Sequence, residues 1–274
     1  MDIIQEKIFD EERALYGVHH ARISHCRFEG PADGESALKE CGDIEIDHSH
    51  FALRYPLWHT DTGTLRNCTM SETCRAALWY DNDLLIEDCE LNGIKALREC
   101  DRIKCNHSSA DSLEFGWFCR DIELNDSSLK SEYPFLKCAR LRATRLKLKG
   151  KYSFQYLEDA EITDSELDTK DAFWHSKNVT VRDSLVKGEY LAWYSENLTL
   201  VRCKIIGTQP LCYAKNLRLI DCTMEACDLS FERSSVEARV AGHIDSVKNP
   251  VAGHIFADSI GEIIMDIPSE CQIN

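Results

Sequence analysis

The strongest constraint on this chain is a repeat of nineteen residues. One central apolar residue marks each repeat: Ile46, Leu65, Ile86, Cys105, Leu124, Ala143, Ile162, Val181, Leu200, Leu219 and Ala238. Nine of the ten intervals between them are nineteen residues long, and the interval after Leu65 is twenty-one. Ile23 belongs to the same series, before a longer gap of twenty-three residues that holds the loop Gly30–Gly34. Such regularity predicts a stack of similar structural units.

Within each repeat, apolar and polar residues alternate around the central residue, which is typical of a short strand with one buried face. Two residues later the side chain is usually polar, and we expect a corner there, because Asp and Asn tolerate left-handed backbone. This position holds His25, His48, Asn67, Asp88, His107, Asp126, Asp164, Asp183 and Asp221. A small residue and then an apolar one follow, which predicts a second strand. Asp or Asn recurs just before the next repeat and predicts a second corner, at Asp43, Asp83, Asp121, Asp159, Asn178, Asn197 and Asn216.

A coil of nineteen residues is too short for a β-α-β unit, which needs about thirty residues. The pattern therefore predicts an all-β fold, a single-stranded right-handed parallel β-helix (solenoid) of about 11–12 rungs of 19 residues. We expect one domain over residues 1–274. An N-terminal cap would cover residues 1–20, regular rungs residues 21–238, and irregular C-terminal rungs and a cap residues 239–274.

The fourteen cysteines fit this repeat. The chain begins without the pattern of a secretory signal, so we expect a cytoplasmic protein with reduced thiols. Cys100, Cys119 and Cys138 are nineteen residues apart and should lie one above another as small apolar fillers, with a metal or redox role as the alternative. The corner residues His25, His48 and His107 are spaced 23 and 59 residues apart and are not expected on adjacent rungs, so we expect no metal site from them. We also expect no cofactor.

The formal net charge of −15 argues against nucleic-acid binding, because phosphate recognition needs a basic surface. It argues in the same way against an anionic membrane surface. No apolar run is long enough to span a bilayer.

All five tryptophans occupy one late position of the repeat, and the residue before each position is mostly apolar. The apolar column should point inward and the tryptophans outward, unless they fill a wide corner of the core. An outward aromatic strip with Tyr, His, Lys and Arg beside it is typical of a surface that binds a sugar or a protein partner. The ligand-binding candidates are Trp58, His59, Trp79, Tyr80, Lys95, Arg98, Trp117, Tyr133, Tyr156, Trp174, Trp193 and Tyr194.

Two groups of residues are candidates for catalysis. Carboxylates on adjacent rungs could act as a glycosidase pair at separations of about 5–9 Å. The first group lies along the strip and comprises Glu114, Glu132, Asp171, His175 and Glu189. The second group, His243, Asp245 and Lys248, lies in the segment Gly242–Pro250. We interpret that segment as a capping turn, with an active-site loop as the alternative.

The chain also resembles an uncharacterised bacterial family of pectin-lyase-like, single-stranded right-handed β-helix proteins, a domain of unknown function. The resemblance covers nearly the whole chain. Its residues are Glu12–Gly17, Arg54–His59, Cys74–Trp79, Asn92–Arg98, Glu114–Phe118, Glu132–Phe135, Gly188–Trp193 and Gly242–Pro250. It implies the fold and no established activity, since fold alone does not specify function.

Two hypotheses about function follow. The first is a cytoplasmic β-helix that binds or processes a carbohydrate, with an oligosaccharide or another small polar ligand on the aromatic strip. If the protein is an enzyme, the activity expected is that of a glycoside hydrolase or a polysaccharide lyase. The second is a non-catalytic interaction or assembly scaffold that forms a homo-oligomer through the strip.

Overall fold

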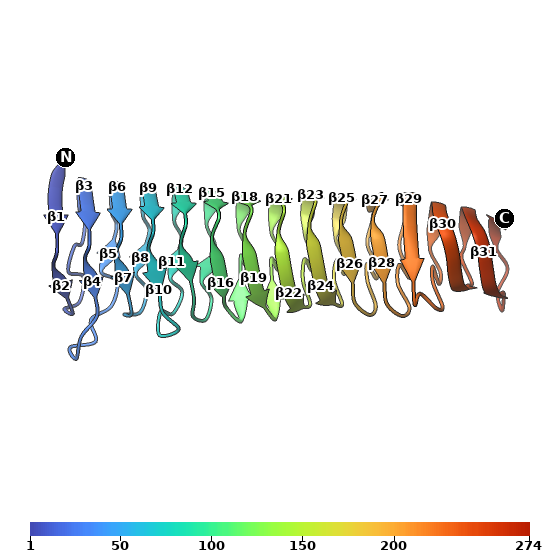
Figure 1. The fold of residues 1–274 in the computed structure, drawn as a ribbon, viewed down its shortest axis with the longest axis horizontal. Coiled ribbons are helices and arrows are strands. Elements are labelled where there is room, and N and C mark those ends of the chain that lie inside the picture. Colours follow the sequence, from blue (N-terminus) through green and yellow to red (C-terminus); the bar gives the residue numbers. More distant parts are fainter. The chain divides into compact units, whose positions relative to one another are not determined.

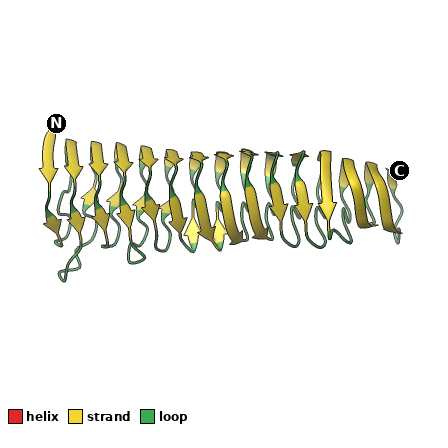
Figure 2. Cartoon of the chain, in the orientation of Figure 1, coloured by secondary structure: helices red, strands yellow, loops and turns green.

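A computed structural model describes residues 1–274 as strands joined by turns, and it contains no helix that could span a membrane (Figure 2). The chain forms two compact units, Met1–Ala139 (unit 1) and Arg140–Asn274 (unit 2). Each unit is a β-solenoid in which equivalent strands of successive turns pair in parallel (Figure 1). The predicted fold class is therefore confirmed. The expectation of one domain over residues 1–274 stays a prediction.

In unit 1 a turn holds two or three short strands. The first strands are β1 (Asp2–Gln5), β3 (His19–Ser24), β6 (Gly42–Asp47), β9 (Asp61–Arg66), β12 (Asn82–Glu87), β15 (Asp101–Asn106) and β18 (Arg120–Asn125). The second strands are β2 (Ile8–Phe9), β4 (Arg27–Phe28), β7 (His50–Phe51), β10 (Thr69–Met70), β13 (Glu90–Leu91), β16 (Ser109–Asp111) and β19 (Ser128–Ser131). The third strands are β5 (Leu38–Lys39), β8 (Leu57–Trp58), β11 (Leu78–Trp79), β14 (Leu97–Arg98), β17 (Glu114–Phe115) and β20 (Tyr133–Pro134).

Unit 2 repeats this arrangement with longer strands toward its end. The first strands are β21 (Ala139–Thr144), β23 (Glu158–Thr163), β25 (Lys177–Arg182), β27 (Thr199–Val201), β29 (Leu217–Glu225), β30 (Ser235–Lys248), β31 (Ala252–Ile264) and β32 (Glu270–Ile273). The second strands are β22 (Lys147–Lys151), β24 (Glu166–Lys170), β26 (Leu185–Lys187) and β28 (Lys204–Ile206). The long strands β29, β30 and β31 run on where earlier turns have two strands.

The register of the first strands follows the nineteen-residue repeat. In unit 1, Ile46 pairs with Leu65, and Leu65 pairs with Ile86, so the longer interval after Leu65 is absorbed outside the strands. In unit 2, Val181 pairs with Leu200 in the same way. These central side chains are buried, and each fully buried aliphatic side chain stabilises the fold by about 1.5–3 kcal/mol.

Both predicted corners are confirmed by the backbone. Asn67 and Asp88 at the first corner have φ of 50° and 53°, and Asp83 and Asn178 at the second have φ of 54° and 55°. These values lie in the left-handed region, which Asp and Asn enter at little cost. The corner residue His107 has the same conformation, so the polar column is set by the geometry of the backbone.

One expectation about the corner histidines was wrong. His25 and His48 do lie on adjacent turns, because Ile23 pairs with Ile46 and the extra residues between them form the Gly30 loop. Their rings stack with centroids 5.0 Å apart and planes 1° apart. His48 Nδ1 also lies 2.8 Å from Asp47 Oδ1.

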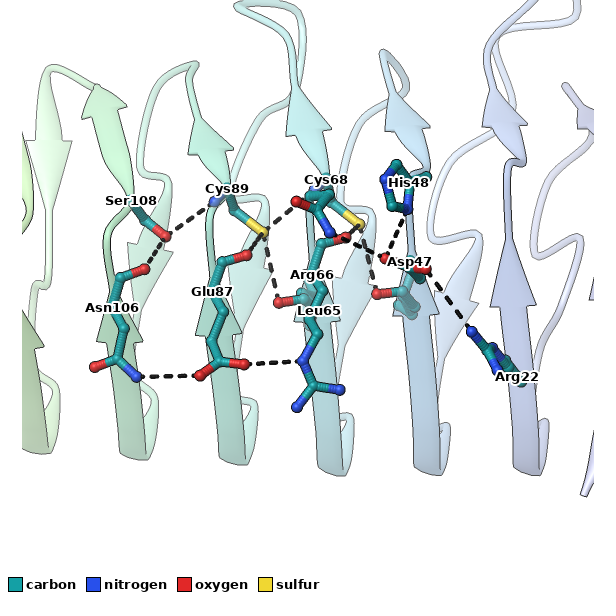
Figure 3. A network of polar contacts seen from close by, with 12 residues as sticks. Arg22, Asp47, His48, Leu65, Arg66, Cys68, Glu87, Cys89, Asn106 and Ser108 are labelled. Carbon is teal, nitrogen blue, oxygen red and sulfur yellow. Dashed lines mark hydrogen bonds and ion pairs between the residues drawn. The ribbon is translucent and has the colours of Figure 1, made fainter.

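The small residue after the first corner makes hydrogen bonds between adjacent turns, which the sequence pattern did not predict (Figure 3). The Cys68 N–H donates to Cys89 Sγ at 3.4 Å, and the Cys89 N–H donates to Ser108 Oγ at 3.0 Å. In turn, Cys89 Sγ donates to the carbonyl of Glu87 at 3.2 Å. Cysteine and serine therefore share this column because each both donates and accepts at a buried corner.

The predicted Cys100, Cys119 and Cys138 column is present. The Cys100 N–H donates to Cys119 Sγ, and backbone bonds align the Cys119 and Cys138 turns. All fourteen cysteines are free, and Cys271 alone is not buried. Burial raises the pKa of Cys41 to about 11 and that of Cys74 to about 12, so these thiols are poor nucleophiles at neutral pH.

The solenoid turns extend further toward both ends of the chain than predicted. Residues 1–20, expected to be a cap, contain a full turn whose strands β1 and β2 pair in register with β3 and β4. At the other end β30, β31 and β32 continue the parallel pairing. The seven first strands of unit 1 and the eight of unit 2 exceed the expected 11–12 rungs for this reason.

Candidate functional site

The tryptophan column lies outside the core in both units. Leu57, Leu78 and Phe173 point inward and are at most 1% exposed. The tryptophans that follow them, among them Trp58 and Trp174, keep part of their surface in solvent. The side chains thus alternate in and out through this segment, as the two columns predict.

The flat faces of the tryptophan rings are nevertheless covered. Trp58 and Trp79 stack with centroids 5.3 Å apart and planes 9° apart. Lys39 Nζ lies 4.3 Å from the Trp58 ring centroid, and Arg98 lies over the Trp117 ring at 5.5 Å. Arg98 therefore occupies the tryptophan column between Trp79 and Trp117, where its planar guanidinium packs in place of an indole ring. Because neighbouring turns occupy these faces, a sugar ring cannot stack on them.

In unit 2, Trp174 and Trp193 stack at 5.4 Å and 3°. Their indole N–H groups donate to backbone carbonyls of the following turn, from Trp174 to Tyr190 at 2.7 Å and from Trp193 to Gln209 at 2.9 Å. The Nε1 atoms of Trp58 and Trp79 are enclosed without a partner. The tryptophans of unit 2 therefore join adjacent turns by both stacking and hydrogen bonding.

A second ladder lies one residue further on, and it is the more exposed of the two. Its rings stack at centroid distances of 4.9–5.0 Å, and Tyr156 and Tyr194 are 45% and 48% exposed. In unit 2 it consists of Tyr156, His175, Tyr194 and Tyr213; His59 and Tyr80 form the equivalent pair in unit 1. These residues have φ of 55–60°, which makes this position a third corner. His59, Tyr80, Tyr156 and Tyr194 were predicted to bind a ligand, but the corner was not predicted, because Tyr is not a typical left-handed residue.

The polar candidates of unit 1 are engaged in ion pairs. Glu114 Oε2 lies 3.6 Å from Arg98 Nη1, and both side chains are largely buried. Arg98 Nε also contacts Glu99 at 3.3 Å. Glu114 thus neutralises the cation within the tryptophan column. Lys95 and Glu132 are half-buried, and Tyr133 is exposed and contacts Trp117 edge-on at 6.5 Å.

In unit 2 the structure brings together Lys170, Asp171 and Glu189. Lys170 Nζ lies 2.8 Å from Glu189 Oε2 and 5.2 Å from the Tyr190 ring centroid. Asp171 is only 5% exposed, and its burial, with a contribution from the charge of Glu189, raises the pKa of its carboxyl. His175 belongs to the exposed ladder.

A glycine holds the Glu189 turn close to the preceding turn. Gly188 has φ of 150°, and a Cβ there would lie 2.1 Å from the carbonyl oxygen of Thr169. No other residue fits this approach without a shift of the backbone. Gly188 therefore fixes the height of Glu189 over Lys170.

The segment Gly242–Pro250 is neither a capping turn nor an active-site loop. Its residues as far as Lys248 belong to β30, which pairs with β31. His243 Nδ1 lies 2.9 Å from Ser259 Oγ, and its Nε2 lies 3.7 Å from Asp245 Oδ1. Lys248 pairs with Glu232 at 3.2 Å. Pairing with β31 outweighs the local turn signal of Gly and Pro.

The buried carboxyl of Asp81 was not predicted from the sequence. Asp81 follows the ladder residue Tyr80 and is completely buried, in the column that also holds Thr60 and Cys100. Its Oδ1 accepts a hydrogen bond from the Thr60 N–H at 2.8 Å, and its Oδ2 has no partner. Burial raises the pKa of Asp81 well above its usual value. Asp81 lies nineteen residues before Cys100, so the repeat places it in the cysteine column, but a carboxyl was not expected among small buried residues.

Comparisons with solved structures found similar proteins at low sequence identity. A mannuronan C-5 epimerase AlgE6 A-module from Azotobacter vinelandii matches with a TM-score of 0.51 at 8% identity, over 94% of this chain and 90% of that one. The AlgE4 A-module from the same organism matches with a TM-score of 0.48 at 8% identity, over 94% and 91%. PfbA, a surface adhesin of Streptococcus pneumoniae, gives 0.36 at 7% identity, over 85% and 72%.

No curated protein sequence matches the chain. At 8% identity, the match to the AlgE6 A-module shows the fold alone. The family described as Protein of unknown function (DUF3737) matches residues 2–274, and the chain belongs to this family.

Proposed function

We propose that the protein binds a polysaccharide lengthwise along the exposed ladder of unit 2, which is formed by Tyr156, His175, Tyr194 and Tyr213. The observation that carries this proposal is a row of rings at 4.9–5.0 Å steps, in which Tyr156, His175 and Tyr194 are exposed and Tyr213 is half-buried. Stacking holds each ring in place before any ligand arrives, so little side-chain entropy is lost on binding.

The ladder offers a polymer a repeated set of contacts. Tyr hydroxyls donate and accept hydrogen bonds, and the imidazole of His175 does the same through its two nitrogens. Because the ring faces are occupied by neighbours, we expect sugar hydroxyls to be recognised at the ring edges. A chain with one polar group for each turn fits such a surface better than a small molecule does.

The fold relatives add support of a weaker kind. The AlgE6 A-module is described as a mannuronan C-5 epimerase module, and mannuronan is a polysaccharide. Its TM-score against this chain is 0.51. The shared solenoid is therefore compatible with a long polysaccharide ligand.

A direct test is affinity electrophoresis against a panel of soluble polysaccharides. We expect at least one to retard the wild-type protein, and Tyr194→Ala with His175→Ala to weaken that retardation at least about tenfold. Tyr16→Ala is the matched control, because Tyr16 is 49% exposed but belongs to no ladder. Retardation by no polysaccharide contradicts the proposal, as does equal retardation of the double variant. A concentration-dependent increase in mass in place of glycan binding would favour the scaffold hypothesis.

A further inference from the structure

Asp171 lies between tyrosines of the two neighbouring turns. Tyr152, Asp171 and Tyr190 occupy one position of successive turns, because Asp171 N–H donates to Glu189 O at 2.9 Å and Tyr152 N–H donates to Lys170 O at 2.8 Å. The Asp171 side chain is buried and has no hydrogen-bond partner, although its oxygens are not fully enclosed. A carboxyl in such a position is unfavourable for stability, and a tyrosine would serve the fold better. The residue therefore calls for a role beyond folding.

The second carboxyl of the cluster is in a contrasting environment. Glu189 is 49% exposed and lies 2.8 Å from the Lys170 ammonium, which also stands over the Tyr190 ring. Bonding to Glu189 raises the pKa of Lys170, so the ion pair persists at neutral pH. Burial also raises the pKa of the Asp171 carboxyl. For a carboxyl this favours the protonated, neutral form, whereas Glu189 is held in an ion pair. Two neighbouring carboxyls with divergent environments are the pattern of an acid and a base.

We propose that Asp171 and Glu189 form a glycoside-hydrolysing pair, with Asp171 as the proton donor, Glu189 as the base and Lys170 as a positioning residue. This inference rests on the proposed function, because the pair lies beside the tryptophans that adjoin the ladder. The hydrogen bond from the Trp174 indole to the Tyr190 carbonyl places the two structures together. The substrate class is a neutral polysaccharide, since a net charge of −15 disfavours a polyanion.

The reaction balances as a simple hydrolysis. The Asp171 carboxylic acid gives its proton to the glycosidic oxygen while the bond from that oxygen to the anomeric carbon breaks, and the electron pair stays on the oxygen. Water forms the new bond to the anomeric carbon as the Glu189 carboxylate takes its proton. The products are an alcohol and a new reducing end. Asp171 is left as the carboxylate and Glu189 as the acid, and proton exchange with solvent restores both.

The experiment compares leaving groups on the full chain. The substrates are neutral polysaccharides, assayed by new reducing ends, and 2,4-dinitrophenyl glycosides, whose leaving group needs no proton. We expect Asp171→Asn to lower kcat/KM at least about 100-fold on the polysaccharide and much less on the aryl glycoside. Glu189→Gln should lower kcat/KM on both. Asp168→Asn is the matched control, since Asp168 is exposed, pairs with Lys187 at 3.4 Å and should leave both rates unchanged.

The wild-type pH profile tests the same point if Asp171→Asn does not fold. kcat/KM on the polysaccharide must fall on the alkaline side as Asp171 loses its proton, and a flat alkaline limb overturns the inference. So does the absence of any hydrolysis by the wild-type protein, or unchanged polysaccharide hydrolysis by Asp171→Asn. Polysaccharide binding without hydrolysis would sink this inference and leave the proposed function standing. Hydrolysis that persists in the Tyr194→Ala, His175→Ala variant would contradict binding along the ladder and leave the hydrolytic pair standing.

Discussion

The buried carboxyl of Asp81 gives the sharpest prediction about stability. Asp81→Asn keeps an oxygen for the Thr60 N–H, which donates to Oδ1 at 2.8 Å in the wild type. It replaces an unpartnered, completely buried oxygen by an amide that never ionises. We expect the variant to be more stable than the wild type at neutral pH, and the difference to grow as the pH rises.

The sign and size of this effect follow from proton linkage. The pKa of Asp81 is raised in the folded chain, so its protonation favours folding at low pH, and that contribution is lost as the pH rises above the unfolded value. The unfolded carboxyl titrates near pH 3.9, and each pH unit between the two pKa values lowers wild-type stability by about 1.4 kcal/mol. Relative to the wild type, the free energy of unfolding of Asp81→Asn should therefore increase by about 1.4 kcal/mol for each pH unit in this range.

Hydrogen exchange of peptides from unit 1 measures this locally, because a solenoid need not unfold as one cooperative unit. Asp83→Asn is the control, because it should lower stability where Asp81→Asn raises it. Asp83 is exposed and bonds Arg102 at 2.7 Å, which lowers its pKa, so losing it should cost at most about 1 kcal/mol and only above its pKa. A pH-independent difference between Asp81→Asn and the wild type would refute the reasoning, as would a variant that is less stable at neutral pH.

Three further predictions concern the ladders, the close turn and the thiols. Trp174→Phe removes a bonded N–H and should cost about 0.5–1.5 kcal/mol more in urea unfolding than Trp79→Phe, whose N–H has no partner; equal losses would contradict the hydrogen-bond argument. Gly188→Ala meets the Thr169 carbonyl at 2.1 Å and should destabilise unit 2 by more than about 1 kcal/mol, so an unchanged melting curve would be inconsistent with so close an approach of the two turns. Mass spectrometry after brief iodoacetamide treatment of the native protein should find label on Cys271 first, and early label on a buried thiol would argue against the packing described.

Much of the fold could be predicted because a solenoid repeats its register in the sequence. The nineteen-residue spacing located paired residues such as Leu200 and Leu219, and the polar residues located two corners. Two features were missed although their spacing follows the repeat. The gap of twenty-three residues between Ile23 and Ile46 applies equally to His25 and His48, but it was not carried over to these corner residues. Asp81 lies nineteen residues before Cys100 but was not recognised as a member of the cysteine column.

The candidate site was harder to predict than the fold. The sequence placed Trp58 and Trp79 in one column, but strand spacing of about 4.8 Å also lets their rings stack and cover each other's faces. The next residue in the sequence is then the more exposed one, as at Tyr194. The left-handed backbone of Tyr194 could not be predicted, because Tyr has no preference for that conformation. The environments that separate Asp171 from Glu189 depend on burial across turns, which spacing alone does not reveal.

Hydroxyl-radical footprinting in the presence of the most strongly retarding polysaccharide tests the central claim most directly. The account predicts protection of Tyr156, His175, Tyr194 and Tyr213, which form the exposed ladder, with Tyr16 unchanged. Protection elsewhere on the chain, or equal oxidation of the ladder with and without the polysaccharide, would contradict it.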